Sequence, residues 1–294
     1  MKKTKILKSP LRYPGSKSSL VPYISNLLRE QCLENGSIIE PYAGSAIVSL
    51  ELLNQGVVSN AILIERDPLV YAFWASVFED PDTLMEEVYK MPVTLETWQS
   101  LKTFKEKDIL ERENIVKVGA AGLFFNRTSF SGILKAGPLG GQEQKSKYLI
   151  DCRFNKERII SQIEDISKLK NKVTVIFDDA VDYLKKNKKD IEKENSFLYL
   201  DPPYYEKGPQ LYRFWYNLNS HKALANFIKD CTNPWLVSYD NHEVIRNLYK
   251  NIGGMKEIFF DYGITSGSRI GKELLISNLE IPPFCQSLFE NNLA

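Results

Sequence analysis

Cysteine and histidine are scarce in this 294-residue sequence, and neither is arranged as a metal or redox site would require. No cysteine pair has the Cys-x-x-Cys spacing, so we expect no zinc site and no other bound metal. Isolated thiols of this kind are typical of a reduced, cytoplasmic protein. The residues concerned are Cys32, Cys152, Cys231, Cys285, His221 and His242.

Long hydrophobic runs are absent as well. No apolar stretch approaches the length of a membrane span, and the lysine-rich start, residues 1–8, never develops the apolar core of a signal peptide. A Gly-x-Gly-x-x-Gly sequence is also missing, so nothing would cradle a pyrophosphate, and the dehydrogenase and kinase classes lose their main support. We therefore expect a cytoplasmic protein with no membrane partner.

Acidic residues are missing from the first 29 positions, which carry seven basic residues, whereas the net charge of the whole chain is only +1. A local basic segment on a nearly neutral protein fits an anionic partner that must be released, although solvated surface lysines explain any single charge equally well. With 43% hydrophobic and 26% charged residues, the chain is that of an ordinary globular protein, large enough for one α/β core with an insertion or for two domains.

The segment Phe197–Tyr205 is the one around which the chain can be organised. Its four apolar residues, 197–200, predict a buried parallel strand, which the two following prolines end by removing backbone donors. Asp201 would then lie at the carboxyl edge of the sheet, where α/β proteins bind ligands. An acid, the fixed carbonyl of Pro202 and the ring of Tyr204 suit a planar amine, although such a turn can also merely close a core strand.

Two earlier segments predict a nucleoside site. The short strand Ser37–Ile39 runs into the glycine-bearing turn Glu40–Ser45, which opens a helix over 46–55. The next strand, 61–64, ends at Glu65, about where a doubly wound fold places the carboxylate that binds a ribose. Because no phosphate cradle accompanies them, a nucleoside cofactor without phosphates fits best.

An insertion interrupts the regular alternation of strands and helices. Between residues 68 and 172, helical spacing occurs at 69–78, 83–89, 95–104, 115–125 and around 159–166. The polar, glycine-rich stretch 126–141 predicts either a segment that contacts a partner or a long surface loop. We therefore divide the chain into a first catalytic part, 1–67, an inserted domain, 68–172, and a second catalytic part, 173–294.

The alternation resumes after the insertion. We predict strands at 173–177, 197–200 and 235–238 and a closing antiparallel pair at 257–262 and 273–278. Ser220 and Asn241 are expected to start the two helices that flank the strand at 235–238. The charged run 185–194 is expected to be a solvated turn.

Three motifs in this order resemble those of the D12-class, Dam-like DNA adenine-N6 methyltransferases: Tyr13-Pro14-Gly15-Ser16-Lys17, Glu40-Pro41-Tyr42-Ala43-Gly44-Ser45 and Asp201-Pro202-Pro203-Tyr204. Weaker similarities extend the resemblance over nearly the whole chain: Asn126-Arg127 with Phe130-Ser131-Gly132, Ser238-Tyr239-Asp240-Asn241, and Arg269–Ile276. The resemblance implies a Rossmann-like, S-adenosylmethionine-dependent methyltransferase sheet with an inserted, mostly helical target-recognition domain.

The resemblance also implies site residues and partners. The catalytic residues would be Asp201, Pro202, Pro203 and Tyr204. The residues expected to contact S-adenosylmethionine are Tyr13, Lys17, Glu40, Gly44, Glu65, Asp179 and Asp201. Those expected to contact DNA, from the recognition segment, are Asn126, Arg127, Ser129, Ser131 and Lys135. We expect a monomer acting on double-stranded DNA, with a cognate restriction endonuclease as a candidate partner in the cell.

Amino-group chemistry supports this reading independently. Adenine N6 is a poor nucleophile because its lone pair is delocalised into the ring. Hydrogen bonds from its two N–H groups to the Asp201 carboxylate and the Pro202 carbonyl would localise that pair toward the donor methyl group. The base must leave the duplex, and the ring of Tyr204 would stack on it.

The chain departs from the family pattern at two places. Glu65 replaces the usual aspartate but can still accept two hydroxyl hydrogen bonds. Thr128-Ser129 and Ser131 stand where the Dam enzymes have glycine and asparagine, and the later Asn-Val-Pro segment is missing. We therefore expect a restriction-associated or phage-type modification enzyme rather than one that methylates GATC.

Other functions of the same fold differ in their residue requirements. Cytosine-C5 methylation is excluded because its nucleophile is a cysteine that follows a proline, and no cysteine here does so. Cytosine-N4 and RNA amino-methyltransferases stay open, as does an inactive DNA-binding regulator. The presence of both Asp201 and Lys17 argues against the regulator.

Overall fold

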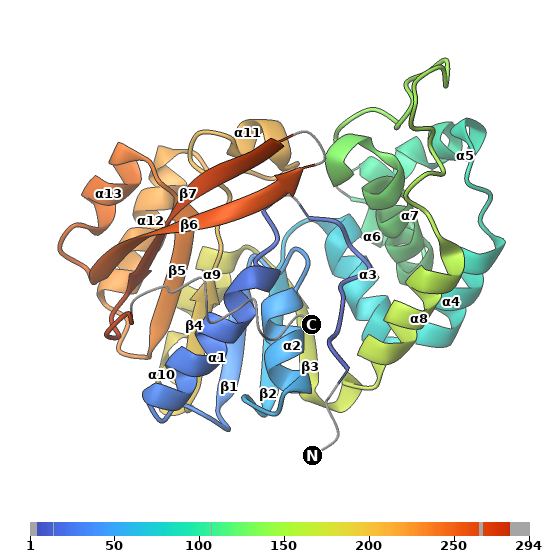
Figure 1. Cartoon of the computed structure of the whole chain (residues 1–294). Helices are drawn as coiled ribbons and strands as arrows, with labels where there is room; N and C mark the ends of the chain where they lie inside the picture. The colour runs from blue at the N-terminus through green and yellow to red at the C-terminus, as the bar shows by residue number, and fades with distance from the viewer. Residues whose placement is uncertain (1–4, 14, 107, 265–266, 283–294) are drawn as a thin grey trace.

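The computed structural model describes residues 5–13, 15–106, 108–264 and 267–282. Pro14 of the first motif and Cys285 lie outside these ranges. Within them, seven strands form one sheet in the order β3-β2-β1-β4-β5-β7-β6 (Figure 1). The strands are β1 (Ser37–Pro41), β2 (Asn60–Glu65), β3 (Val173–Phe177), β4 (Ser196–Leu200), β5 (Trp235–Asp240), β6 (Gly254–Ile264) and β7 (Gly267–Ser277).

The strand order reverses between β1 and β4. β1 pairs in parallel with β2 on one side and with β4 on the other, so the connections leave these two neighbours in opposite directions. Such a switch point opens a crevice at the carboxyl ends of the strands. β7 lies antiparallel to β5 and β6, which closes the sheet with the predicted hairpin and confirms the Rossmann-like fold.

Helices cover both faces of the sheet, and all five residues of β4 are buried between them. One face carries α1 (Val21–Glu30) and α2 (Ile47–Asn54), whose apolar side chains share a core with β1 and β4. The other face carries α9 (Ala180–Lys186), α10 (Lys188–Lys193), α12 (Leu218–Lys229) and α13 (Glu243–Tyr249). The short helix α11 (Gly208–Leu211) follows β4.

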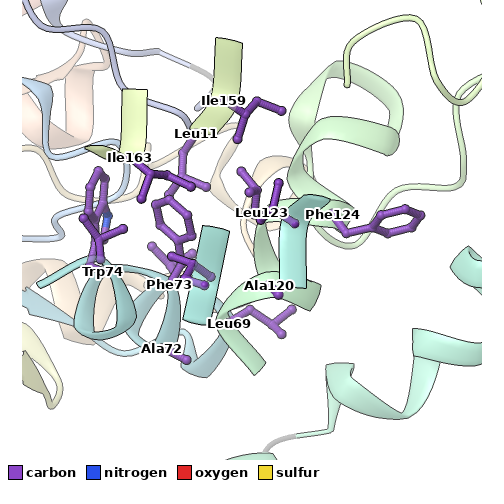
Figure 2. Close-up of a cluster of buried hydrophobic side chains, with 14 of the residues drawn as sticks. Leu11, Leu69, Ala72, Phe73, Trp74, Ala120, Leu123, Phe124, Ile159 and Ile163 are labelled. Atoms are coloured by element: carbon purple, nitrogen blue, oxygen red, sulfur yellow. The ribbon is translucent and has the colours of Figure 1, made fainter. Parts of the chain in front are cut away.

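The segment between β2 and β3 is mostly helical, and it lies beside the β3 edge of the sheet (Figure 1). Its helices are α3 (Pro68–Glu79), α4 (Pro81–Lys90), α5 (Leu95–Ser100), α6 (Ile109–Arg112), α7 (Ile115–Thr128) and α8 (Lys156–Ser167). Figure 2 shows Phe73, Trp74 and Leu123 in their common core, which also takes in Leu11 of the N-terminal segment. Since the core continues into the rest of the molecule, the domain limits at 67 and 172 stay a prediction.

Close packing of α3 against α7 depends on glycine. A Cβ atom at Gly122 would lie 2.4 Å from the carbonyl oxygen of Leu69, and one at Gly119 would lie 2.7 Å from that of Ala72. Any side chain there would force the two backbones apart. The two glycines of α7 thus allow the close packing that places the polar segment 129–141, which follows this helix.

Three predictions of local structure were wrong. Asn217, not Ser220, caps α12, because its side chain accepts the backbone N–H of Ser220 from one turn earlier. His242, not Asn241, caps α13 in the same way. The charged run after residue 185 forms α10 rather than a turn, since Ile191 is buried beneath it.

Among the residues described, none of the helices combines the length and the apolar character needed to cross a membrane.

Candidate active site

A cleft lies at the carboxyl ends of β1, β2 and β4, beside the switch point of the sheet. The N-terminal loop, the turns that follow β1 and β2, and the loop that follows β4 line it. The predicted site residues that line this cleft are Tyr13, Lys17, Glu40, Gly44, Glu65, Asp201 and Pro203. The fold therefore brings together motifs that are widely separated in the sequence.

Lys17 is the buried cation of the cleft, with 4% of its side chain exposed. Its ammonium group donates to the Gly15 carbonyl at 2.8 Å, the Asp201 carboxylate at 3.0 Å and the Tyr204 hydroxyl at 3.1 Å. It also lies 3.6 Å from the Glu273 carboxylate. Burial alone would lower the pKa of Lys17, but Asp201 and Glu273 together raise it well above its usual value. Lys17 is consequently charged.

Asp201 follows directly after β4, and its carboxylate is held from two sides. Lys17 approaches it from the N-terminal loop, and the Ser238 hydroxyl donates to it at 2.8 Å from β5. Burial raises the pKa of Asp201, and Lys17 opposes this shift. Because 24% of the side chain is exposed, the fixed carboxylate can still accept a hydrogen bond from a ligand.

Tyr204 is anchored by its hydroxyl group. That hydroxyl donates to Glu273 at 2.7 Å and accepts from Lys17 at 3.1 Å. Gly15 makes room for it, because a Cβ at Gly15 would lie 2.8 Å from the hydroxyl and the φ angle there is +76°. Sequence reasoning assigned a role only to the ring, and it missed Glu273. The available signal was that Glu273 is the one acid of β7 and stands directly before three apolar residues, 274–276.

Asp240 holds the loop that carries the two prolines. Its carboxylate accepts the backbone N–H groups of Tyr205 and Glu206, at 3.0 and 3.3 Å. Asp240 ends β5, so the neighbouring strand fixes the loop that follows β4. Two members of the weak motif 238–241 thus hold the segment after β4: Ser238 bonds the Asp201 carboxylate, and Asp240 bonds the loop backbone.

Glu65 organises the glycine turn. One of its carboxylate oxygens accepts the Gly44 N–H at 3.1 Å, and the other accepts the N–H groups of Arg66 and Asp67 at 2.9 Å. Gly44 has a φ angle of +47°, and a Cβ there would lie 3.0 Å from the ring of Tyr13. The turn therefore requires glycine, both for its conformation and for the close approach of the aromatic ring.

Two buried carboxyl groups of the cleft titrate near neutrality. Burial raises the pKa of Glu40 to about 8, although Ser49 stabilises the charged form through its backbone N–H at 3.1 Å. Burial likewise raises the pKa of Glu65 to about 7. A positively charged ligand would favour the ionised forms of both groups.

This cleft has the motifs and topology of an amino-methyltransferase, and a comparison with family models gives the same result. The model described as D12 class N6 adenine-specific DNA methyltransferase matches residues 13–260. The chain belongs to this family. It is therefore a DNA adenine methyltransferase, an assignment that favours adenine N6 over the cytosine-N4 and RNA alternatives.

The methyltransferase also matches individual proteins. The Type II methyltransferase M.CviBI of Paramecium bursaria Chlorella virus NC1A is 24% identical over 277 residues, which cover 94% of this chain and 99% of that protein. A solved structure from Pyrococcus horikoshii, provisionally described as an RNA methyltransferase, covers 94% of this chain and 91% of its own at 10% identity, with a TM-score of 0.39.

Three further residues of the D12 methyltransferase line the cleft, and sequence reasoning missed them. They are the consecutive residues Tyr212, Arg213 and Phe214. Tyr212 stacks on Tyr13 with ring centroids 5.9 Å apart. Arg213 donates to Asp67 at 2.7 Å. The sequence signal that could have indicated them is an arginine between two aromatic residues, soon after Asp201–Tyr204.

Asp179 does not line the cleft of the methyltransferase. Its carboxylate caps α9 and accepts hydrogen bonds from Arg66 at 2.9 Å and from Tyr216 at 3.1 Å. Because this carboxylate is occupied by the protein itself, the expected contact of Asp179 with a cofactor has no support from the geometry.

The predicted recognition residues fall into two groups. Asn126 and Ser129 are buried, and both ends of the Asn126 amide bond the backbone of Arg12, at 2.6 and 2.8 Å. Asn126 therefore joins the N-terminal segment to α7, and the expected direct contact of Asn126 and Ser129 with a base is not supported. Ser131 and Lys135 are exposed, and Lys135 donates to the carbonyl of Pro209 in the loop that follows β4.

Proposed function

We propose that this chain transfers a methyl group from S-adenosylmethionine to N6 of an adenine that is flipped out of double-stranded DNA. The observation that carries the proposal is the cluster at the end of β4, where Lys17, Ser238 and Glu273 orient Asp201 and Tyr204. Pro202 completes the site, since its carbonyl is fixed by the proline ring and by the following Pro203.

The donor set of the cleft fits S-adenosylmethionine. The charged side chains that line it comprise four acids, Glu40, Glu65, Asp67 and Asp201, against three bases, Lys17, Arg66 and Arg213. This acidic excess suits a ligand that carries a sulfonium and an ammonium group. The ring of Tyr13 beside Gly44 would contact the adenosyl part, and Glu65 would accept the ribose hydroxyl groups. When bound, the donor supplies an electrophilic methyl group.

The residues of this chain orient the acceptor amine. The ionised Asp201 can only accept hydrogen bonds, as can the Pro202 carbonyl, so two N–H groups of N6 would be held by two acceptors. The lone pair of N6 then points away from both, toward the methyl group. Lys17 contributes by keeping Asp201 charged and in place. Alignment of the two reactants provides most of the remaining rate enhancement.

The ring of Tyr204 is proposed to stack on the flipped adenine, held in position by its hydroxyl group. On the DNA side we propose contacts from Arg127, Ser131 and Lys135 of the recognition segment, with Asn126 and Ser129 as positioning residues. The chain would act as a monomer.

We further propose a role in restriction–modification or in phage-type DNA modification. A full-length similarity to a viral protein named as a Type II methyltransferase supports this role. It implies a cognate endonuclease, whose cleavage of the same site would be blocked by methylation.

Radioactive methyl transfer tests the proposed activity. The purified protein is incubated with labelled S-adenosylmethionine and plasmid DNA, and the product is digested to nucleosides. We expect the label in N6-methyladenine, none in N4-methylcytosine, and none after incubation with RNA. Asp201→Ala is the matched control and should give no labelled nucleoside. Label in any other product would overturn the proposal, as would the absence of transfer by the wild-type protein.

A further inference from the structure

A second cleft, here named the basic cleft, lies between the N-terminal segment, the end of α7 and the start of α8. Its volume is about 370 Å³, which is large enough for a group of ligand size. Among the described residues that line it there is no acid, and five side chains are cationic: Lys8, Arg12, Arg127, Arg153 and Arg158. Neither Asp151 nor Glu157, their neighbours in the sequence, lines the basic cleft.

The arginines of the basic cleft differ from the others of the chain in their pairing. Where the side chain is described, every arginine outside this cleft forms an ion pair with a carboxylate: Arg29–Glu34, Arg66–Asp179, Arg112–Glu106, Arg213–Asp67 and Arg246–Glu257. No ion pair with a described residue is formed by Arg12, Arg127, Arg153 or Arg158. Among the arginine side chains that the structure describes, those without an ion pair are thus confined to the basic cleft.

The innermost of them, Arg127, is half-buried in the last turn of α7. Its Nε atom is shielded from solvent and has no hydrogen-bond partner in the described part of the chain. Burial lowers the pKa of Arg127 to about 10, and repulsion from Arg12 and Arg158 adds to this effect. A guanidinium group in such surroundings has lost hydration without gaining a counter-charge, which an anion would supply.

The start of α8 reinforces the positive potential of the basic cleft. This helix has 12 residues, and Asn155, which caps it, lines the cleft together with Arg158 from its first turn. The partial positive charge of a helix N-terminus favours anions in addition to the side chains. Three separate segments of the chain therefore converge with charge of one sign.

We propose that the basic cleft binds a phosphodiester group of the DNA backbone. Arginine is suited to this ligand because its planar fork forms two parallel hydrogen bonds with phosphate oxygens. Lys8, Arg153 and Arg158 are exposed, so the rim is open to a large partner. The inference rests on the proposed function, since it takes DNA as the substrate.

The position of the basic cleft relative to the active site favours DNA over free phosphate. Arg12 lines the basic cleft and the next residue, Tyr13, lines the methyl-transfer cleft. Asn126 bonds the backbone of Arg12 and directly precedes Arg127 in α7. This contact therefore holds Arg12 and Arg127 in position relative to each other. A backbone phosphate bound here would position the duplex without reading its sequence.

Salt-dependent DNA binding tests this assignment. The variant is Arg153→Gln/Arg158→Gln, at two exposed positions, and the matched control is Lys189→Gln/Lys193→Gln on α10, which removes the same charge from exposed positions elsewhere. Affinity for fluorescent duplexes of several sequences is measured over a series of salt concentrations. We expect the variant to bind all duplexes more weakly and to lower the slope of log affinity against log salt by about 1. The control should keep the wild-type slope.

Calorimetry with inorganic phosphate separates the two sources of the ligand. If the slope is unchanged in the variant but phosphate binds to the wild type and not to the variant, the site takes free phosphate and the assignment to DNA is overturned. If neither measurement responds, no phosphate site exists. Failure of the proposed function is distinguishable, because it is read from methyl transfer by the wild-type protein.

Discussion

The ammonium group of Lys17 lies 3.0 Å from the carboxylate of Asp201, although 184 positions separate the two residues in the sequence. The pair links the N-terminal loop to the end of β4, the middle strand of the seven-stranded sheet. Among the described residues, neither Lys17 nor Asp201 forms an ion pair within its own segment. The Asp201 carboxylate therefore gains its partners only through the tertiary fold, from the N-terminal loop and from β5.

Replacement of Asp201 by Ala should abolish methyl transfer, because it removes one acceptor from the reacting amine. The fold should survive, since 24% of the side chain is exposed and β4 is held by apolar burial. Transfer of labelled methyl to DNA measures the effect, with circular dichroism as the check on folding. A folded variant whose rate lies within about tenfold of the wild type would show that the proposed chemistry is wrong.

Tyr204→Phe should retain much of the activity, and Tyr204→Ala should lose most of it. Stacking of a base on an aromatic ring contributes about 1–3 kcal/mol, and only the alanine variant loses the ring. Phenylalanine loses the hydroxyl that bonds Glu273, so we expect a moderate loss from poorer positioning. Rates of single-turnover transfer distinguish the two effects. Equal losses would assign the role to the hydroxyl group.

Lys17→Met should weaken binding of S-adenosylmethionine and destabilise the protein. Removal of the cation takes the charge of Lys17 away from Asp201 and Glu273, a change that costs about 3 kcal/mol in buried pairs. The double variant Lys17→Met/Glu273→Gln should recover stability without recovering activity. Calorimetry gives the donor affinity and urea unfolding gives the stability. An unchanged affinity for S-adenosylmethionine together with full activity would show that Lys17 is not part of the site.

The ligand-free protein should lose stability as the pH rises through about 8. Burial raises the pKa of Glu40 from 4.5 to about 8, so the folded state favours the protonated form. The corresponding stabilisation is complete below the unfolded pKa and disappears above the folded one. Glu40→Gln should therefore raise the melting temperature at about pH 9 and change it little at about pH 5. An equal shift at both pH values would contradict the buried, protonated state.

Asn126→Ala should act on stability rather than on base preference. It would remove the Asn126 partner of the part-buried backbone N–H and carbonyl of Arg12, at a cost of about 2 kcal/mol. Lys135→Ala, at an exposed position, should leave stability unchanged and weaken DNA binding. Urea unfolding and methylation of single-base variants of the target separate the two. If a fully stable Asn126→Ala protein changes its base preference, Asn126 contacts a base of the target directly.

The sequence by itself determined the order of the strands along the chain and the chemistry of the three motifs. Four apolar residues before Asp201 predict a strand because only a doubly buried strand needs apolar side chains on both faces. The turns at Gly15 and Gly44 are visible in the sequence because glycine marks a local backbone requirement. Properties that depend on a few neighbouring residues can be predicted in this way.

Only the tertiary structure decided which side chains share a partner. Nothing local marks Glu273 as the acceptor of the Tyr204 hydroxyl, or Asn126 as the residue that bonds the backbone of Arg12. The caps of α12 and α13 differed from prediction because several residues with suitable side chains stand together and packing selects one of them. Long-range contacts of this kind are set by how helices and strands meet in space, which the spacing of residues along the chain does not encode.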